Sequence, residues 1–441
     1  MNIFSLSRKN ILANPLTTLM SVLLFALSIG LITFITLFNH QLKKGLENNL
    51  ASIDMVIGAK GSPLQLILSS MYHIDAPTGN IPLEESLPFL NPAHPLIATA
   101  VPLCLGDSYG AYRIAGTPPS ILTLYGATQL EGRLYHDDFE VLAGATVASK
   151  LGLHTGSTFY STHGLQDNPD LAHDHGAPFI VEGILKPTGT ILDQLILCTP
   201  ATVWKVHEHD STTETTPHTG GAHDHSETGH EHASTIRLDT GEIAVISDTV
   251  LSSLRHAPDK EITSILIRLK NKTSIQSLNF LRNINANTGL MAASPAMELN
   301  RLYAMMGNGT EAFSALAILI GIVAAISMFI SLYTSLRQRR YEMALMRVAG
   351  AGPGKLFQMI IAEGFWIAFL GWMLGMAAGH LGMRWAGDVL ERTYRYPFTG
   401  WVWVDAEVWI GIGAIVIGIL AAVVPAIQGA RTNLHQTLAE K

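Results

Sequence analysis

The chain has 441 residues, of which 48% are hydrophobic and only 14% charged, and its formal net charge is −7. This composition is too apolar for an ordinary soluble protein of the same length. The negative charge, without a long basic run, argues against nucleic acid as a partner.

Four apolar blocks are long enough to cross a hydrocarbon core as helices, which takes about 20 residues each. They are residues 15–38, 313–333, 356–383 and 408–427. The first block is too long for the apolar part of a signal peptide, and no small-x-small cleavage site follows it, so we expect it to be retained. The sequence therefore predicts an integral membrane protein with one helix, a large domain and then three more helices.

Basic residues near the ends of these blocks predict the orientation. Arg8 and Lys9 lie in an amphipathic lead-in at 1–14, five basic residues lie at 334–355, and others lie in the tail at 428–441. We expect these three segments in the cytoplasm, although basic residues also follow the first block and lie at 384–407. Residues 39–312 and the short loop 384–407 are then expected on the outer side of the membrane, in an oxidising compartment.

Short apolar runs separated by glycine and proline predict an α+β domain between the first and second helices. A polar stalk is expected at 40–50, and two strands around a Gly106-Asp-Ser turn at 95–116. Other strands are expected at 54–62, 179–185, 194–197 and 262–269, with helices at 146–151, 274–284 and 297–306.

The third block carries Gly371, Gly375 and Gly379 at four-residue spacing. Such a face lets membrane helices approach closely, so we predict helix packing there, although glycine is also common in flexible membrane helices. Glu363 and His380 lie within or beside the same block. Ionisable groups in a membrane are usually paired or functional, and Glu363 could instead lie at the interface.

Residues 339–351 read RRYEMALMRVAGA, and Glu363 follows at the start of the next span. This order resembles the segment R-x-x-E-x-A-x-x-R-x-x-G-A of FtsX/MacB/LolC-type ABC transporter permeases. The last span ends in PAIQG, similar to the family's P-A-x-x-A but with Gly429 in place of the final alanine. The layout of one helix, a MacB-like periplasmic domain and three helices also matches the family.

The resemblance implies a non-catalytic permease subunit without a catalytic cofactor. It would couple ATP hydrolysis by a separate cytoplasmic ABC ATPase, in two copies, to movements of the periplasmic domain, and would form a homodimer or heterodimer. The segment 334–355 is then a coupling helix, whose contact residues are expected to be Arg339, Arg340, Glu342, Met343, Met346, Arg347 and Gly350. The glycine-rich stretch 350–355 is no phosphate loop, because it lacks the Ser or Thr and follows a helix.

A predicted insertion at about 163–234 holds ten of the 18 histidines, interleaved with carboxylates. Imidazole and carboxylate groups bind zinc and similar divalent ions. The candidate ligands are His173, His175, His207, His209, His223, His225, His230 and His232. A metal role would add a periplasmic metal carrier as a candidate partner; the alternative is a polar loop that binds metal only adventitiously.

Cys104 and Cys198 both lie in apolar, strand-like runs on the oxidising side. Either they form a disulfide, which would contribute about 4–5 kcal/mol in the chain-entropy model, or they are two separately buried thiols.

Two other functions compete with transport driven by an ATPase. A regulatory transducer would activate a periplasmic partner and move no substrate. A secondary metal transporter would need several histidine or carboxylate ligands at mid-membrane, where only Glu363 and His380 come close.

Overall fold

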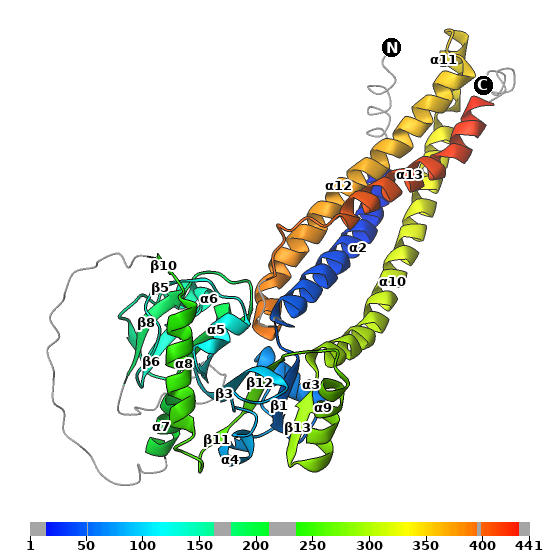
Figure 1. Ribbon diagram of the computed structural model, residues 1–441. Coiled ribbons are helices and arrows are strands. Elements are labelled where there is room, and N and C mark those ends of the chain that lie inside the picture. The colour runs from blue at the N-terminus through cyan, green and yellow to red at the C-terminus, as the bar shows by residue number, and fades with distance from the viewer. Residues whose placement is uncertain (1–14, 51, 163–177, 211–234, 395–397, 432–441) are drawn as a thin grey trace. The chain divides into compact units, whose positions relative to one another are not determined.

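The computed structural model describes residues 15–50, 52–162, 178–210, 235–394 and 398–431. These residues divide into two compact units. The helical unit holds the described residues up to Lys43, Tyr303–Arg392 and those from Phe398 onward. The sheet-bearing unit holds Lys44–Leu302 together with Thr393 and Tyr394. Figure 1 labels the elements of both units.

Among the described residues, four helices are long and apolar enough to cross a membrane. They are α2 (Pro15–Leu50), α10 (Pro295–Gln338), α12 (Pro353–Tyr394) and α13 (Ala406–Ala430), and the short helix α11 (Arg340–Val348) joins α10 to α12 (Figure 1). Each of the four predicted spans lies within one of these helices. The helix α12 is longer than its span, and it continues to Tyr394, well into the segment predicted as a loop at 384–407.

The apolar residues of α2 divide between two faces. Val22, Phe25 and Ile29 are at most 6% exposed and pack in the helical unit, whereas Leu23 and Leu27 are 48% and 59% exposed. Exposed leucines in such a number suit a hydrocarbon surrounding rather than water. One side of this helix therefore packs against protein, and the composition of its other side suits a hydrocarbon surrounding.

The sheet-bearing unit contains an 11-stranded mixed sheet in the order β10-β5-β8-β6-β9-β4-β3-β12-β1-β13, with β7 paired to β8. Its strands are β1 (Met55–Ala59), β3 (Ile97–Tyr109), β4 (Tyr112–Gly116), β5 (Gln129–Gly132), β6 (Glu140–Ala143), β7 (Thr158–Phe159), β8 (Phe179–Leu185), β9 (Leu195–Cys198), β10 (Thr235–Arg237), β12 (Ser264–Leu269) and β13 (Leu290–Ala293). Two more strands, β2 (Ile81–Pro82) and β11 (Glu261–Ile262), form a separate pair. The strands predicted at 179–185 and 262–269 are confirmed.

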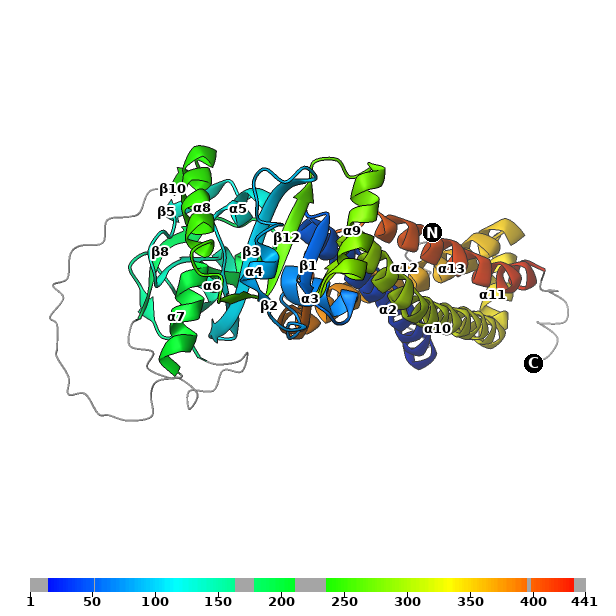
Figure 2. The same cartoon turned by 60° about the horizontal axis from the view of Figure 1, so that its bottom comes forward.

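Helices cover this sheet and close its core. They are α3 (Pro63–Met71), α4 (Leu83–Ser86), α5 (Ser120–Leu124), α6 (Ala145–Leu151), α7 (Pro200–Asp210), α8 (Thr240–Leu254), α9 (Ile275–Asn287) and the 3-10 helix η2 (Ile191–Gln194). The helices α3 and α9 lie beside β1 and β13 (Figure 1), and Figure 2 again shows α3 next to β1. The helix α7 contacts β3 and β4. A continuous apolar core that includes Ile57, Ile114 and Val181 joins the strands to these helices.

The predicted turn at Gly106 is wrong, because β3 runs through it to Tyr109. The turn instead lies at Gly110 and Ala111, which both have positive φ, +53° and +66°. Two successive residues of that kind suit a tight hairpin. At Gly106 the pairing of β3 with β4 shifts its register between Leu105 and Ser108, so the glycine marks an irregularity within a long strand.

Cys104 and Cys198 are free and buried, so the disulfide is not formed. Gly116 of β4 pairs with Cys104 of β3 on one side and with Cys198 of β9 on the other. Two strand spacings separate the cysteine Cα atoms by about 9.6 Å, beyond the 4.4–6.8 Å that a disulfide allows. Burial raises the pKa of both thiols well above the usual range.

Candidate functional site

The short helix α11 is set off from its two long neighbours by a turn at each end. The helix α10 ends at Gln338, and Arg339 leaves the helical region with φ −104° and ψ 16°. After Val348, Gly350 has φ +95°, a conformation that costs glycine little. Pro353 then starts α12, where the N–H that it lacks is not needed. The predicted coupling segment 334–355 thus holds the end of α10, the 9-residue helix α11 between two turns, and the start of α12.

The inner face of α11 is buried. Met343 and Ala344 are 3% and 2% exposed, and Met343 lies in an apolar cluster with Leu336 of α10, Met359 of α12 and Ala426 of α13. Met346 is partly buried against the same cluster. Met343, predicted to contact a partner, is instead covered by the helices of its own chain.

Arg339 also turns inward. Its Nη1 atom lies 4.0 Å from Oε1 of Glu363 on α12, and the two side chains are 12% and 9% exposed. A charge removed from water needs an opposite charge nearby. Arg339, predicted to meet the ATPase, therefore lies against Glu363, and the carboxylate singled out within the third span has a cationic neighbour.

The outer face of α11 consists of Arg340, Tyr341, Glu342, Leu345 and Val348. The three apolar members are 47%, 56% and 66% exposed, and their spacing of four and then three residues places them along one stripe. Arg340 and Glu342 are exposed beside this stripe, whereas Arg347 is half-buried. The outer face combines apolar area with both charges, and the inner cluster holds it in place.

The three glycines of the predicted packing face, Gly371, Gly375 and Gly379, all lie against α2. A Cβ atom on Gly375 would come within 2.8 Å of both the Ala26 carbonyl oxygen and the Ile29 Cβ atom. A Cβ atom on either of the other two glycines would come similarly close to an atom of α2. The two helices can therefore lie this close only because these positions carry no side chain.

Two further contacts between small residues were not found from the sequence. Gly30 of α2 faces the backbone of Gly375, since a Cβ on Gly30 would lie 3.1 Å from the Gly375 carbonyl oxygen. About two turns before Gly371, on nearly the same face of α12, Gly364 lies against Gly418 of α13, whose carbonyl oxygen is 3.0 Å from the position of a Cβ on Gly364. The helix α12 thus packs tightly against both α2 and α13, and these glycines meet α13 at its earlier turns and α2 at its later ones.

Gly429 stands where the family pattern has alanine. A Cβ atom there would lie 2.6 Å from the Ile360 Cδ1 atom and 2.8 Å from the Leu336 Cδ1 atom. Both side chains belong to the cluster beneath α11. The glycine at this position therefore makes room for the larger side chains of that cluster.

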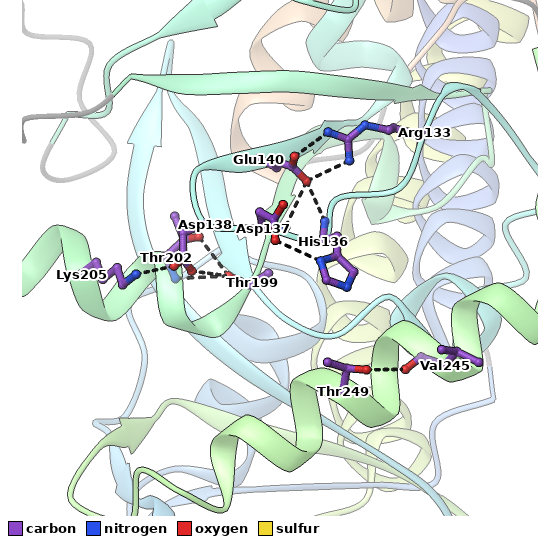
Figure 3. Close-up of polar contacts among 10 residues, drawn as sticks. All are labelled: Arg133, His136, Asp137, Asp138, Glu140, Thr199, Thr202, Lys205, Val245 and Thr249. Carbon is purple, nitrogen blue, oxygen red and sulfur yellow. Dashed lines mark hydrogen bonds and ion pairs between the residues drawn. The ribbon is translucent and has the colours of Figure 1, made fainter.

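A buried carboxylate organises the loop before β6 in the sheet-bearing unit (Figure 3). Glu140 accepts hydrogen bonds from the backbone N–H groups of His136 and Asp137, at 2.9 and 3.0 Å, and from the Arg133 guanidinium. Burial acts to raise the pKa of Glu140, but these hydrogen bonds outweigh it and lower the pKa below 4.5. Nearby, Lys205 of α7 pairs with Asp138 of the same loop.

The side chains of all eight predicted metal ligands lie outside what the structure describes. His207 and His209 belong to α7, but the structure does not describe their side chains. The other six histidines lie in segments that the structure does not describe. Within the described residues, no three His, Cys, Asp or Glu side chains are grouped so that they could hold a metal ion.

Glu363 and His380 do not form a shared site. Both lie on the continuous helix α12, 17 residues apart, which separates them by about 25 Å along the helix axis. A mid-membrane metal site built from these two residues is therefore excluded by the helix itself.

Comparison with known families identifies the part of the chain that contains α11. Residues 314–434 match the model of the FtsX-like permease C-terminal domain, and a comparison with curated proteins gave no match. Members of this family are generally non-catalytic membrane subunits, and the family implies an ABC transporter with a separate ATPase. Residues 314–434 thus carry an FtsX-like permease C-terminal domain, and this match, with the four candidate membrane helices, supports an ABC transporter permease of the FtsX/MacB/LolC type.

Proposed function

We propose that the chain is the transmembrane subunit of a mechanotransmission-type ABC transporter. In this function, a separate ATPase in the cytoplasm pushes on α11, and the movement reaches the sheet-bearing unit in the periplasm. The observation that supports it best is the outer face of α11, where Leu345 and Val348 are more than half exposed next to Arg340 and Glu342. Apolar area combined with charges of both signs suits a protein partner.

The packing of α11 against the other helices supports the same proposal. Its inner cluster contains side chains from α10, α12 and α13, and closely packed side chains resist compression. A force on α11 would therefore be passed to three membrane helices rather than absorbed by a loop. The contacts of α12 with α2 through Gly375 extend that path to the fourth helix.

The orientation and the assembly are part of the proposal. Arg340, Arg347 and Lys355 lie in or beside α11, and basic residues favour the cytoplasmic side of a membrane. We place α11 in the cytoplasm and the sheet-bearing unit in the periplasm of a bacterial inner membrane. Two copies of the ATPase would serve a homodimer or heterodimer of permeases.

The double variant Arg340→Glu with Leu345→Asp tests the coupling. Because both side chains are exposed, the variant should fold. The amount of ATPase that co-purifies with it should be at least about tenfold lower than with the wild type. The full chain is purified in detergent, and the bound ATPase is compared with that of the wild type. Arg282→Glu, an exposed charge reversal on α9, serves as the control.

Thermal stability of the double variant is measured in parallel. Loss of ATPase with unchanged stability supports the proposal. Unchanged co-purification, or a wild-type chain that retains no ATPase at all, contradicts it.

We further propose that the histidine-rich segment takes part in handling a divalent metal such as zinc. The support is compositional: four His-x-His pairs with neighbouring carboxylates lie in residues 163–234, and such tracts bind zinc. Replacing His223, His225, His230 and His232 by asparagine should remove most of the zinc bound by the full chain in calorimetry. His256→Asn, which changes an exposed histidine outside the segment, should leave the zinc uptake unchanged, and equal uptake by all three proteins would contradict the metal role.

A further inference from the structure

A large cavity lies beside α9 in the sheet-bearing unit. Its volume is about 760 Å³, and it is bordered by α9, the start of β1, the loop after β12 and the first turn of α10, all labelled in Figure 1. Sites for small organic molecules typically have volumes of about 300–1,000 Å³. The cavity shares no residue with α11 or with the loop that Glu140 organises, so neither of those sites accounts for it.

Large apolar side chains that line this cavity are strongly exposed. Ile275 and Leu278 of α9 are 76% and 65% exposed, and Met297 of α10 is 67% exposed. The lining also includes Ile53 and Met55, which are only 5% and 2% exposed. Exposed apolar side chains gathered around a hollow are typical of a binding site, because a ligand removes them from water.

Lipid does not explain these exposed side chains. The two membrane helices that contribute to the cavity do so outside their apolar blocks. Leu50 of α2 comes after the block 15–38, and Met297 of α10 comes before the block 313–333. A ligand for this cavity therefore arrives from the aqueous phase.

The charged residues that line the cavity leave an excess of one positive charge. One oxygen of Asp54 lies 2.7 Å from Nζ of Lys272, and the other accepts a backbone N–H at 2.8 Å. Arg282 of α9 is exposed and forms no ion pair with any residue that the structure describes. Glu298 of α10 does not line the cavity, whereas the amide of Asn279 does, three residues before Arg282 on the same face of α9. A guanidinium pairs with a carboxylate through two parallel hydrogen bonds.

We propose that this cavity binds an amphiphilic organic monoanion from the aqueous phase. Its carboxylate pairs with Arg282, and its apolar body covers Ile275, Leu278 and Met297. A second copy of the chain suits the cavity less well, because a symmetric contact would bring two surfaces with excess positive charge together. Binding here is independent of ATPase coupling at α11, so either proposal can fail without the other.

The test is photo-cross-linking of the full chain in phosphatidylcholine nanodiscs. The probe is octanoate with a diazirine near the end of its chain, and the matched probe is the corresponding octanol. Both are used below saturation at the same free concentration in water, and adducts within residues 275–281 are counted by tandem mass spectrometry. The carboxylate probe should label this segment at least about tenfold more than the alcohol, the size expected for hydrogen bonds to a charged group.

Variants of Arg282 assign the head group. Arg282→Gln should lower labelling by the carboxylate probe at least about tenfold, to the level of the alcohol, and Arg282→Lys should restore part of it. Arg255→Gln, which changes an exposed arginine elsewhere in the same unit, should behave as the wild type. Labelling of α13 by probe dissolved in the membrane should be the same in all four proteins.

Equal labelling by the two probes, or labelling that Arg282→Gln leaves unchanged, would overturn the proposal. Absence of label on α9 would overturn it too, since this result is expected if a second copy or another protein covers the cavity. Nanodiscs that also contain phosphatidylglycerol separate the two sources of an anionic amphiphile. Unchanged labelling in them supports a ligand from water, whereas displacement of the probe would assign the cavity to a membrane lipid and contradict the proposal.

Discussion

Replacing Gly375 by alanine is expected to destabilise the helical unit by about 1–3 kcal/mol, the usual cost of overpacking. The new methyl group would lie 2.8 Å from the Ala26 carbonyl oxygen and from the Ile29 Cβ atom. Neither atom is the end of a flexible side chain, so α2 and α12 must move apart. The loss should appear as a lower unfolding free energy of the full chain in detergent, measured by denaturant titration.

Gly382→Ala on the same helix provides the control. A Cβ at Gly382 meets only the Phe34 Cδ2 atom, at 3.6 Å, an ordinary contact. Alanine is also favoured over glycine in a helix by about 0.5–1 kcal/mol. Gly382→Ala should therefore leave stability unchanged or raise it slightly, and an equal loss in both variants would show that the glycines act through helix flexibility instead of packing.

Glu140→Ala is expected to lower the unfolding free energy of the sheet-bearing unit by about 2–3 kcal/mol. The backbone N–H groups of His136 and Asp137 would lose their acceptor, and Arg133 would lose its main carboxylate partner. Because the Arg133 side chain is 53% exposed, the backbone hydrogen bonds should account for most of the loss. Unfolding by urea, followed by circular dichroism, measures the effect.

Asp137→Ala is the matched control, since that side chain is 77% exposed and its removal should change stability by less than about 0.5 kcal/mol. A comparable loss in the two variants would mean that Glu140 does not organise the loop.

The stabilisation by Glu140 should also depend on pH. Its pKa in the folded protein is lower than the ordinary value of 4.5, so the folded state holds the carboxylate form more strongly than the unfolded chain does. The contribution is therefore complete above about pH 4.5 and disappears as the pH falls through the folded-state value. The stability gap between the wild type and Glu140→Ala should narrow over that acidic range, and a constant gap would contradict this assignment.

The sequence by itself determined the membrane class and the helices. Apolar blocks such as 313–333 are stable as helices only in a membrane or in the core of a large protein. The spacing of Gly371, Gly375 and Gly379 places them on one helix face before any partner is known. Local patterns of this kind depend only on residues close together in the chain, so they can be read directly.

Tertiary structure decided which way each face points. Met343 and Leu345 are both apolar members of α11, yet Met343 is buried and Leu345 exposed, because the docking of α11 against three other helices selects its inner side. Arg339 turns to Glu363, and β4 separates Cys104 from Cys198, for the same reason. Periodicity groups residues on a face, whereas only contacts between distant segments determine what that face meets.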